Sequence, residues 1–117
     1  MVTTFRVTER EVGPSRHPVL QIHGELGLSE VDELQKALAA AAARHPEDIV
    51  IGLEDCEFVD SMALAALLRA RDRMAEDGRR LAIAGPTGQV LRIIEISGLD
   101  LDGFFFASVE EAVAAEG

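Results

Sequence analysis

Two short, wholly apolar runs, each followed by a stretch with helical spacing, constrain the fold of this chain more than any other feature. Ile49–Leu53 and Leu81–Ala84 contain no charged residue. Continuous apolar runs of this length are typical of strands that are covered on both faces, as in a parallel sheet. The chain is therefore predicted to be α/β, with helices covering a mostly parallel sheet.

Periodicity and start and stop signals predict the remaining elements. Further strands are expected over Thr4–Val12, Val19–His23 and Phe104–Phe106, the first of them antiparallel and near an edge. Helices are expected from an N-cap at Ser29 to a stop at Pro46, from about Ser61 to Asp77 with Gly78 as the stop, after Thr87 as far as Ser97-Gly98, and after an N-cap at Ser108. Glu54–Val59 is expected to be a loop. The prediction is a mixed, mostly parallel sheet of about five strands with about four helices.

Composition sets the size and the setting. The 117 residues are predicted to form a single domain over 1–117, and the 48% of residues that are hydrophobic suffice for its core. The net charge of −10 argues against binding to nucleic acid or to anionic membranes, which require cationic groups. The N-terminus has no signal-peptide pattern, and no apolar run approaches the ~20 residues of a spanning helix, so a cytoplasmic location is expected.

No pattern for catalysis, metal binding or cofactor binding stands out. Gly85–Gly88 lacks the lysine of a phosphate-binding loop, and no nucleophile-elbow motif is present. The acidic cluster around Glu54–Asp60 could perform acid–base chemistry, but it is more typical of an acidic surface at a helix start. Cys56 is expected to be a small buried side chain. The histidines have no metal-ligand spacing and are expected to be solvated: His17, His23 and His45.

The segment Phe58–Leu64 is the strongest candidate for function. An apolar pair precedes Asp60 or Ser61, either of which can cap the following helix. A helix start also favours anions, so a phosphate added here would change the surface and could switch binding on or off. The alternative is an ordinary N-cap without a further role.

This segment also carries a family resemblance. Asp60–Leu64, with the sequence Asp-Ser-Met-Ala-Leu, resembles the Asp-Ser-Ser-Gly-Leu motif of STAS domains, which are named for sulphate transporters and anti-sigma-factor antagonists. The resemblance extends from about Phe5 to Val113. It also includes Gly24-Glu25-Leu26, the run Ile49–Leu53 before Phe58-Val59-Asp60, Val90–Ile94 with Ser97-Gly98-Leu99, and Ser108–Val113.

The resemblance implies a STAS fold and a binding module without catalytic activity. Antagonists of this family bind a serine-kinase anti-sigma factor, which then phosphorylates the second hydroxyl residue of the motif. Here that position is Met62, which has no hydroxyl, whereas Ser61 matches the first serine and is the remaining candidate for phosphorylation. Gly27 stands where the family usually has Asp.

Three functions follow as hypotheses. The first is an anti-sigma-factor antagonist in a partner-switching pathway that regulates transcription, lacking the usual phosphoacceptor. The second is a STAS subunit of an ABC-type phospholipid transport complex, because such domains tolerate an apolar residue after Asp-Ser and bind the ATPase. The third is a nucleotide- or lipid-binding domain that uses the helix start. The expected partner-binding residues are Glu57, Asp60, Ser61, Met62, Ala63 and Leu64.

Overall fold

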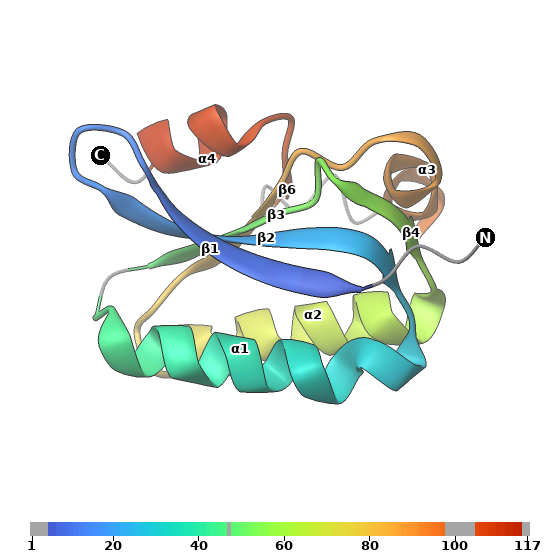
Figure 1. The fold of residues 1–117 in the computed structure, drawn as a ribbon, viewed down its shortest axis with the longest axis horizontal. Coiled ribbons are helices and arrows are strands. Elements are labelled where there is room, and N and C mark those ends of the chain that lie inside the picture. Colours follow the sequence, from blue (N-terminus) through green and yellow to red (C-terminus); the bar gives the residue numbers. More distant parts are fainter. Residues whose placement is uncertain (1–4, 47, 98–104, 116–117) are drawn as a thin grey trace.

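The computed structural model describes residues 5–46, 48–97 and 105–115, whose strands form one sheet with helices on both sides (Figure 1). The elements in chain order are β1 (Arg6–Val12), β2 (His17–Leu26), the 3-10 turn η1 (Leu28–Glu30), α1 (Val31–Arg44), β3 (Ile49–Gly52), β4 (Cys56–Val59), α2 (Ser61–Glu76), β5 (Leu81–Ala84), α3 (Gly88–Ser97), β6 (Phe105–Phe106) and α4 (Val109–Ala114).

The sheet is mixed and mostly parallel, as predicted. Its strands follow the order β1-β2-β3-β5-β6, and β1 pairs antiparallel with β2 at one edge while the other pairs are parallel. Strand β2 is long enough to serve two parallel partners. Its Val19–Gln21 segment pairs with β3, and its Gly24–Leu26 segment pairs with β4. The C-terminal end of β2 therefore pairs with β4 instead of β3.

Two expectations about local structure are wrong. The segment predicted as a loop contains β4, because the backbone of Cys56–Val59 pairs with β2 across a bulge between Gly24 and Glu25. Ser29 is not the N-cap of α1, because it lies within η1. The Glu30 carboxylate instead reaches back and accepts the backbone N–H of Gly27 at 3.0 Å.

Other helix ends agree with the predictions. Gly78 ends α2 with a positive φ of 72°, and the N–H of Arg79 bonds back to the Met74 carbonyl at 2.8 Å. The Ser108 hydroxyl accepts the N–H of Glu111 at the start of α4. Of the predicted elements, Thr4, Phe104 and the pair Gly98-Leu99 lie outside the described residues. Within the residues that the structure describes, no helix is both long and apolar enough to cross a membrane.

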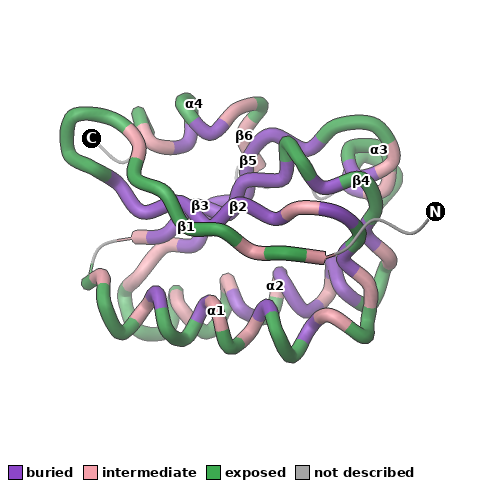
Figure 2. The backbone as a smooth tube through the Cα atoms, in the orientation of Figure 1, coloured by how far each residue is buried: buried purple, intermediate pink, exposed green. Residues whose placement is uncertain are grey.

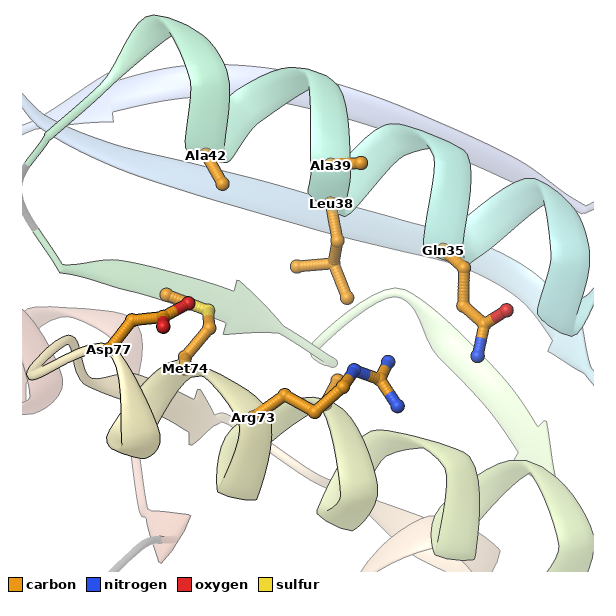
Figure 3. A pocket seen from close by; sticks show the side chains of 8 residues that line it. Gln35, Leu38, Ala39, Ala42, Arg73, Met74 and Asp77 are labelled. Carbon is orange, nitrogen blue, oxygen red and sulfur yellow. The ribbon is translucent and has the colours of Figure 1, made fainter.

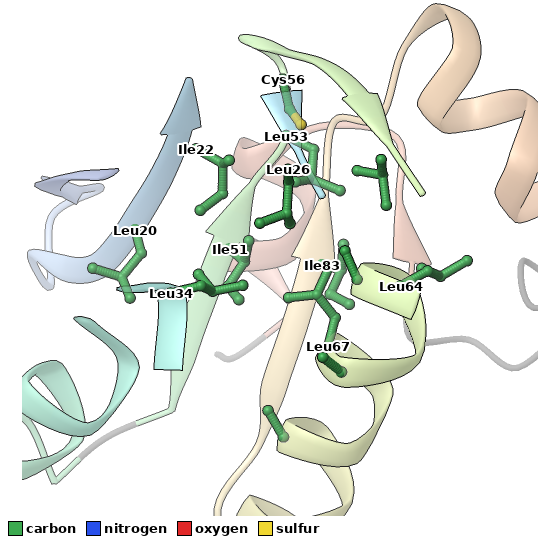
Figure 4. Close-up of a cluster of buried hydrophobic side chains, with 14 of the residues drawn as sticks. Leu20, Ile22, Leu26, Leu34, Ile51, Leu53, Cys56, Leu64, Leu67 and Ile83 are labelled. Atoms are coloured by element: carbon green, nitrogen blue, oxygen red, sulfur yellow. The ribbon is translucent and has the colours of Figure 1, made fainter. Parts of the chain in front are cut away.

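The larger core lies between the sheet and the helix pair α1 and α2 (Figure 4). Alternate residues of β2, together with Ile51 and Ile83 of the central strands, meet Leu34 of α1 and Leu67 of α2 there. All of β3 and β5 is buried, whereas β1 is mostly exposed (Figure 2). The apolar runs are therefore central strands, which is the arrangement that their composition predicted.

The opposite face of the sheet is covered by fewer apolar side chains. A second cluster joins Val19, Val50 and Ala82 of the sheet to Val109 and Ala112 of α4. Its side chains are small, and α4 has only six residues. Gln21 of β2 lies on the same face, next to Gly52, and is 4% exposed.

Candidate functional site

Asp60 organises the junction between β4 and α2. One carboxylate oxygen, Oδ1, accepts the N–H of Ala63 at 2.7 Å and so caps α2. The other oxygen, Oδ2, accepts the N–H of Leu28 at 3.0 Å, which ties η1 to the helix start. Of the two caps considered from sequence, Asp60 is the one used. A single side chain therefore fixes two chain segments that are far apart in sequence.

Gly27 leaves the room that this arrangement needs. A Cβ at position 27 would lie 3.2 Å from Asp60 Oδ2 and 3.3 Å from Glu30 Oε1, which is tighter than ordinary contact. An aspartate at this position would also bring another carboxylate beside two existing ones. The departure from the family pattern at Gly27 therefore fits the local crowding of acidic groups.

Strand β4 is held on its outer side by a side chain instead of another strand. The Gln89 amide of α3 donates to the Val59 carbonyl and accepts the Val59 N–H, both at 3.1 Å. The amide thus takes the place of a neighbouring strand for one residue. Sequence reasoning missed this contact, because only the fold brings α3 against β4.

The exposed side chains around this junction are largely apolar. Of the five large hydrophobic side chains that are exposed among the described residues, three lie on η1, β4 and the first turn of α2: Leu28 at 60%, Phe58 at 40% and Met62 at 53%. We call the group Leu28, Glu57, Phe58, Ser61 and Met62 the α2 cap surface. Scattered single apolar residues are normal on a surface. These three are related to one capping residue, because Leu28 bonds to Asp60 and the other two lie two positions from it in the chain.

The predicted site residues divide between this surface and the core. Glu57, Ser61 and Met62 are exposed, and Asp60 is half-buried beneath them. Ala63 and Leu64 are buried at 0% and 5%, so they position the first turn of α2 against the core. Leu28 was missed, because it lies in the turn before the expected helix start. Phe58 belongs to the segment singled out from the sequence but not to the expected partner-binding residues, and it is exposed on β4.

Cys56 has no features of a reactive thiol. It is 2% exposed, its Sγ lies 3.4 Å from the Phe58 carbonyl, and burial raises the pKa of the thiol. Raising the pKa keeps the sulfur protonated, and the thiolate is the nucleophilic form. The side chain fills the core beneath β4, as the sequence predicted.

The histidines are more structured than expected. His17 is 6% exposed, so the expectation that it is solvated is wrong. His23 Nε2 lies 2.8 Å from the Thr8 hydroxyl, and His45 Nε2 lies 2.9 Å from the Glu9 carboxylate. In the described part of the chain, no three His, Cys, Asp or Glu side chains come together as a metal site.

A separate groove runs between α1 and α2, on the side away from the sheet (Figure 3). It has a volume of about 250 Å³, with Leu38, Ala42 and Met74 as its apolar lining and Arg73 and Asp77 among its polar groups. These are packing residues of two neighbouring helices. The groove adds no group to the α2 cap surface.

Comparisons with known proteins agree with the fold. A family model described as "Mlab, STAS domain" matches residues 10–105. The anti-sigma-B factor antagonist of Staphylococcus aureus is 28% identical over 80 residues, which cover 68% of this chain and 74% of that protein.

Solved structures share the whole architecture. A putative anti-sigma factor antagonist from Thermotoga maritima superposes with a TM-score of 0.74 at 19% identity, covering 93% of this chain and 92% of that one. An anti-sigma factor antagonist from Mycobacterium paratuberculosis superposes with a TM-score of 0.77 at 22% identity, covering 94% and 93%. At these identities the likeness establishes the fold.

The strand order and the helices that cover the sheet are those of a STAS domain, an α/β module. The chain belongs to the STAS family, matched here by the model described as "Mlab, STAS domain". It is a distant homologue of anti-sigma-B factor antagonists.

Proposed function

We propose that this protein is an anti-sigma-factor antagonist that binds a serine-kinase anti-sigma factor through its α2 cap surface. The observation that carries the proposal is the exposure of Leu28, Phe58 and Met62 around the Asp60 cap, in a chain related to antagonists. We further propose that residues 1–117 act as one domain, and that it works in the cytoplasm, where such a partner would reside.

The chemistry of the surface suits a protein partner. Removing apolar side chains such as Phe58 and Met62 from water favours association, and Met adapts its shape to the surface it meets. The net charge of −10 would steer the protein towards a basic patch on the partner. Asp60 fixes η1 and α2 relative to one another, so the surface is largely formed before binding.

Regulation by phosphorylation would differ from that of the family. Met62 cannot accept a phosphate, so we propose that partner binding persists without the usual switch. Ser61 is exposed at the first position of α2, where a phosphate would gain from the helix N–H groups. It would also bring about −1.5 to −2 charge beside Asp60 and Glu57, which opposes it. Ser61 is therefore the residue at which to look for a modification.

The first test is affinity capture of the tagged protein from its host, with mass spectrometry of the bound proteins and of the bait. A kinase-type anti-sigma factor in the capture is the expected result. A phosphate mapped to Ser61 would show that a switch survives the loss of the acceptor at Met62. Absence of binding to every kinase-type anti-sigma factor of the host, tested one by one with purified protein, would contradict the proposal.

The second test places a charge on the surface. Met62→Asp should weaken binding of the captured anti-sigma factor at least about tenfold, because a charge replaces an apolar contact. Ile96→Asp is the matched control, since Ile96 is also exposed but lies on α3 outside the α2 cap surface. Equal affinities of the Met62→Asp variant and the unsubstituted protein would show that the docking surface lies elsewhere.

The alternative is a STAS subunit of an ABC-type phospholipid transport complex. The exposed apolar side chain of Met62 after Asp60-Ser61 favours it, since such domains carry an apolar residue there. The same surface would then dock on an ATPase. Capture of an ABC-type ATPase together with unmodified bait would support this function in place of the antagonist function.

A further inference from the structure

Gln21 of β2 is a buried polar side chain without a hydrogen-bond partner in the described part of the chain. It is 4% exposed, and neither its Nε2 nor its Oε1 has a hydrogen-bond partner among the described residues. The fold makes room for it, because a Cβ on the neighbouring Gly52 would lie only 2.4 Å from Gln21 Oε1. Burying an amide without hydrogen bonds is unfavourable, so this arrangement needs an explanation outside the packing of the core.

The same glutamine lies at the floor of a polar hollow of about 320 Å³ on the lightly covered face of the sheet. This volume is at the lower end of the range for small-molecule sites. The hollow combines residues of β1, β2 and the segment after β3: Thr8, Arg10, Gln21, His23, Glu54 and Asp55.

The groups at the rim of this hollow pair with one another. His23 Nε2 lies 2.8 Å from the Thr8 hydroxyl, and His23 Nδ1 lies 3.5 Å from the Asp55 carboxylate. Arg10 and Glu54 form a looser ion pair at 3.6 Å, with side-chain exposures of 46% and 40%. Exposed pairs of this kind are weak, so they hold these two side chains only loosely. The Gln21 amide atoms are shielded from solvent, so access to them requires side chains of the hollow to shift.

We propose that this hollow is a binding site for a small neutral compound with an amide edge, that is, a carbonyl beside an N–H, as in a pyrimidine base. The Gln21 amide offers one donor and one acceptor side by side, which such an edge complements. Glu54 and Asp55 disfavour an anion, and their contacts with Arg10 and His23 reduce what they offer a cation. The proposal does not depend on which protein partner binds the α2 cap surface.

A titration with uracil tests the site. With the ¹⁵N-labelled protein, uracil should shift the side-chain amide resonances of Gln21 and the backbone amides of Thr8 and His23 in a saturable manner. The matched ligand 1,3-dimethyluracil, which lacks the ring N–H groups, should cause no such shift. Absence of a uracil-dependent shift, or equal shifts with both compounds, would overturn the proposal.

Substitution of the glutamine gives a second readout that needs no ligand. Gln21→Met should abolish the uracil response and raise the Tm by roughly 4 °C, because an unpaired buried amide is removed. Gln35→Met on α1 is the matched control and should change neither measurement.

A fall in the Tm of Gln21→Met would show that the amide has a partner in the fold. A water that stays bound to Gln21 throughout the titration would show that the hollow holds solvent only. Either result would overturn the proposal.

Discussion

Both ends of the helix pair α1 and α2 are held by a charged side chain that hydrogen-bonds to the backbone. The two ends differ in the exposed side chains around them, which are apolar at one end and charged at the other. At one end, the Asp60 carboxylate caps the start of α2 and bonds to η1, which leads into α1. At the other end, the Arg79 guanidinium follows α2 and donates to carbonyls at the end of α1, to Ala42 at 3.1 Å and to His45. An anion thus serves a helix N-terminus and a cation serves a C-terminus, as the helix dipole favours.

The surroundings distinguish the proposed binding end from the other end. Around Asp60 the exposed side chains are Leu28, Phe58 and Met62, which gain from being covered by a partner. Around Arg79 the neighbours are charged and already paired, as in the contacts of Glu9 with Arg44 and His45. Covering such charges costs desolvation. The two helix ends are therefore hydrogen-bonded in the same way, and only the apolar side chains beside Asp60 support the proposed binding surface there.

Arg79→Met should have the largest effect on stability, about 2 kcal/mol, because it removes charged hydrogen bonds to two carbonyls. Urea denaturation measures it as a lower midpoint with an unchanged slope. Arg69→Met, on the exposed face of α2, is the control and should lie within about 0.5 kcal/mol of the unsubstituted protein.

Substitutions at the Arg79 end and at the Asp60 end should differ in their effect on partner affinity. Arg79→Met should leave affinity for the captured partner unchanged once the protein is folded. A loss of affinity as large as that from Met62→Asp would break the distinction between the two ends, since it would place the Arg79 end in the interface.

Asp60→Ala should destabilise the protein by about 1 to 2 kcal/mol, because α2 loses its cap and Leu28 loses a hydrogen-bond acceptor. It should also reduce partner affinity, since η1 and α2 are no longer fixed together. Asp60→Asn keeps an amide oxygen as the cap and should recover much of the stability.

Ser61→Ala, at an exposed hydroxyl that does not cap, should cost less than about 0.5 kcal/mol. Equal losses from Asp60→Ala and Ser61→Ala in thermal or urea unfolding would contradict the assignment of the cap.

The parts of the fold that could be predicted are those whose signal is local. Ile49–Gly52 and Leu81–Ala84 are apolar throughout because both faces of these strands are covered. Gly78 ends α2 because its positive φ suits glycine. Such features depend on neighbouring residues, so the sequence displays them directly.

The parts that were missed depend on contacts between distant segments. Strand β4 has only four residues, two of them exposed, and it exists because β2 extends far enough to pair with it. Its outer side is completed by Gln89, thirty positions along the chain from Val59. The first turn before α1 was also missed, because Glu30 bonds back to Gly27 where a serine cap was expected at Ser29.

The candidate site was predicted in its position but not in its composition. The Asp60-Ser61-Met62 motif placed it at the start of α2, and Asp60 is the cap there. Leu28 joins the site only through its N–H bond to Asp60, and no periodicity indicates that contact. Gln21 was assigned to a strand, but its burial without a partner follows from the space above Gly52, which no local pattern shows.

Glu9→Gln should have the smallest effect, about 0.5 kcal/mol at pH 7, because surface ion pairs contribute little. The hydrogen bond from His45, followed by the Arg44 contacts, lowers the pKa of Glu9 below its ordinary value of 4.5. A carboxyl group with a lowered pKa in the folded state stabilises the protein above the unfolded pKa. That contribution is lost as the pH falls through the folded pKa.

The difference in unfolding free energy between the unsubstituted protein and Glu9→Gln should therefore be full at pH 7 and shrink below about pH 4.5. It should also shrink in high salt, which screens exposed charges. Glu11→Gln is the matched control, because Glu11 lies on the same strand and forms an ion pair with the exposed Arg16 at 3.4 Å. Urea unfolding at a series of pH values measures both variants. A difference for Glu9→Gln that grew as the pH fell would contradict a lowered pKa of Glu9 in the folded state. It would mean that the charged end near Arg79 does not stabilise the fold through Glu9.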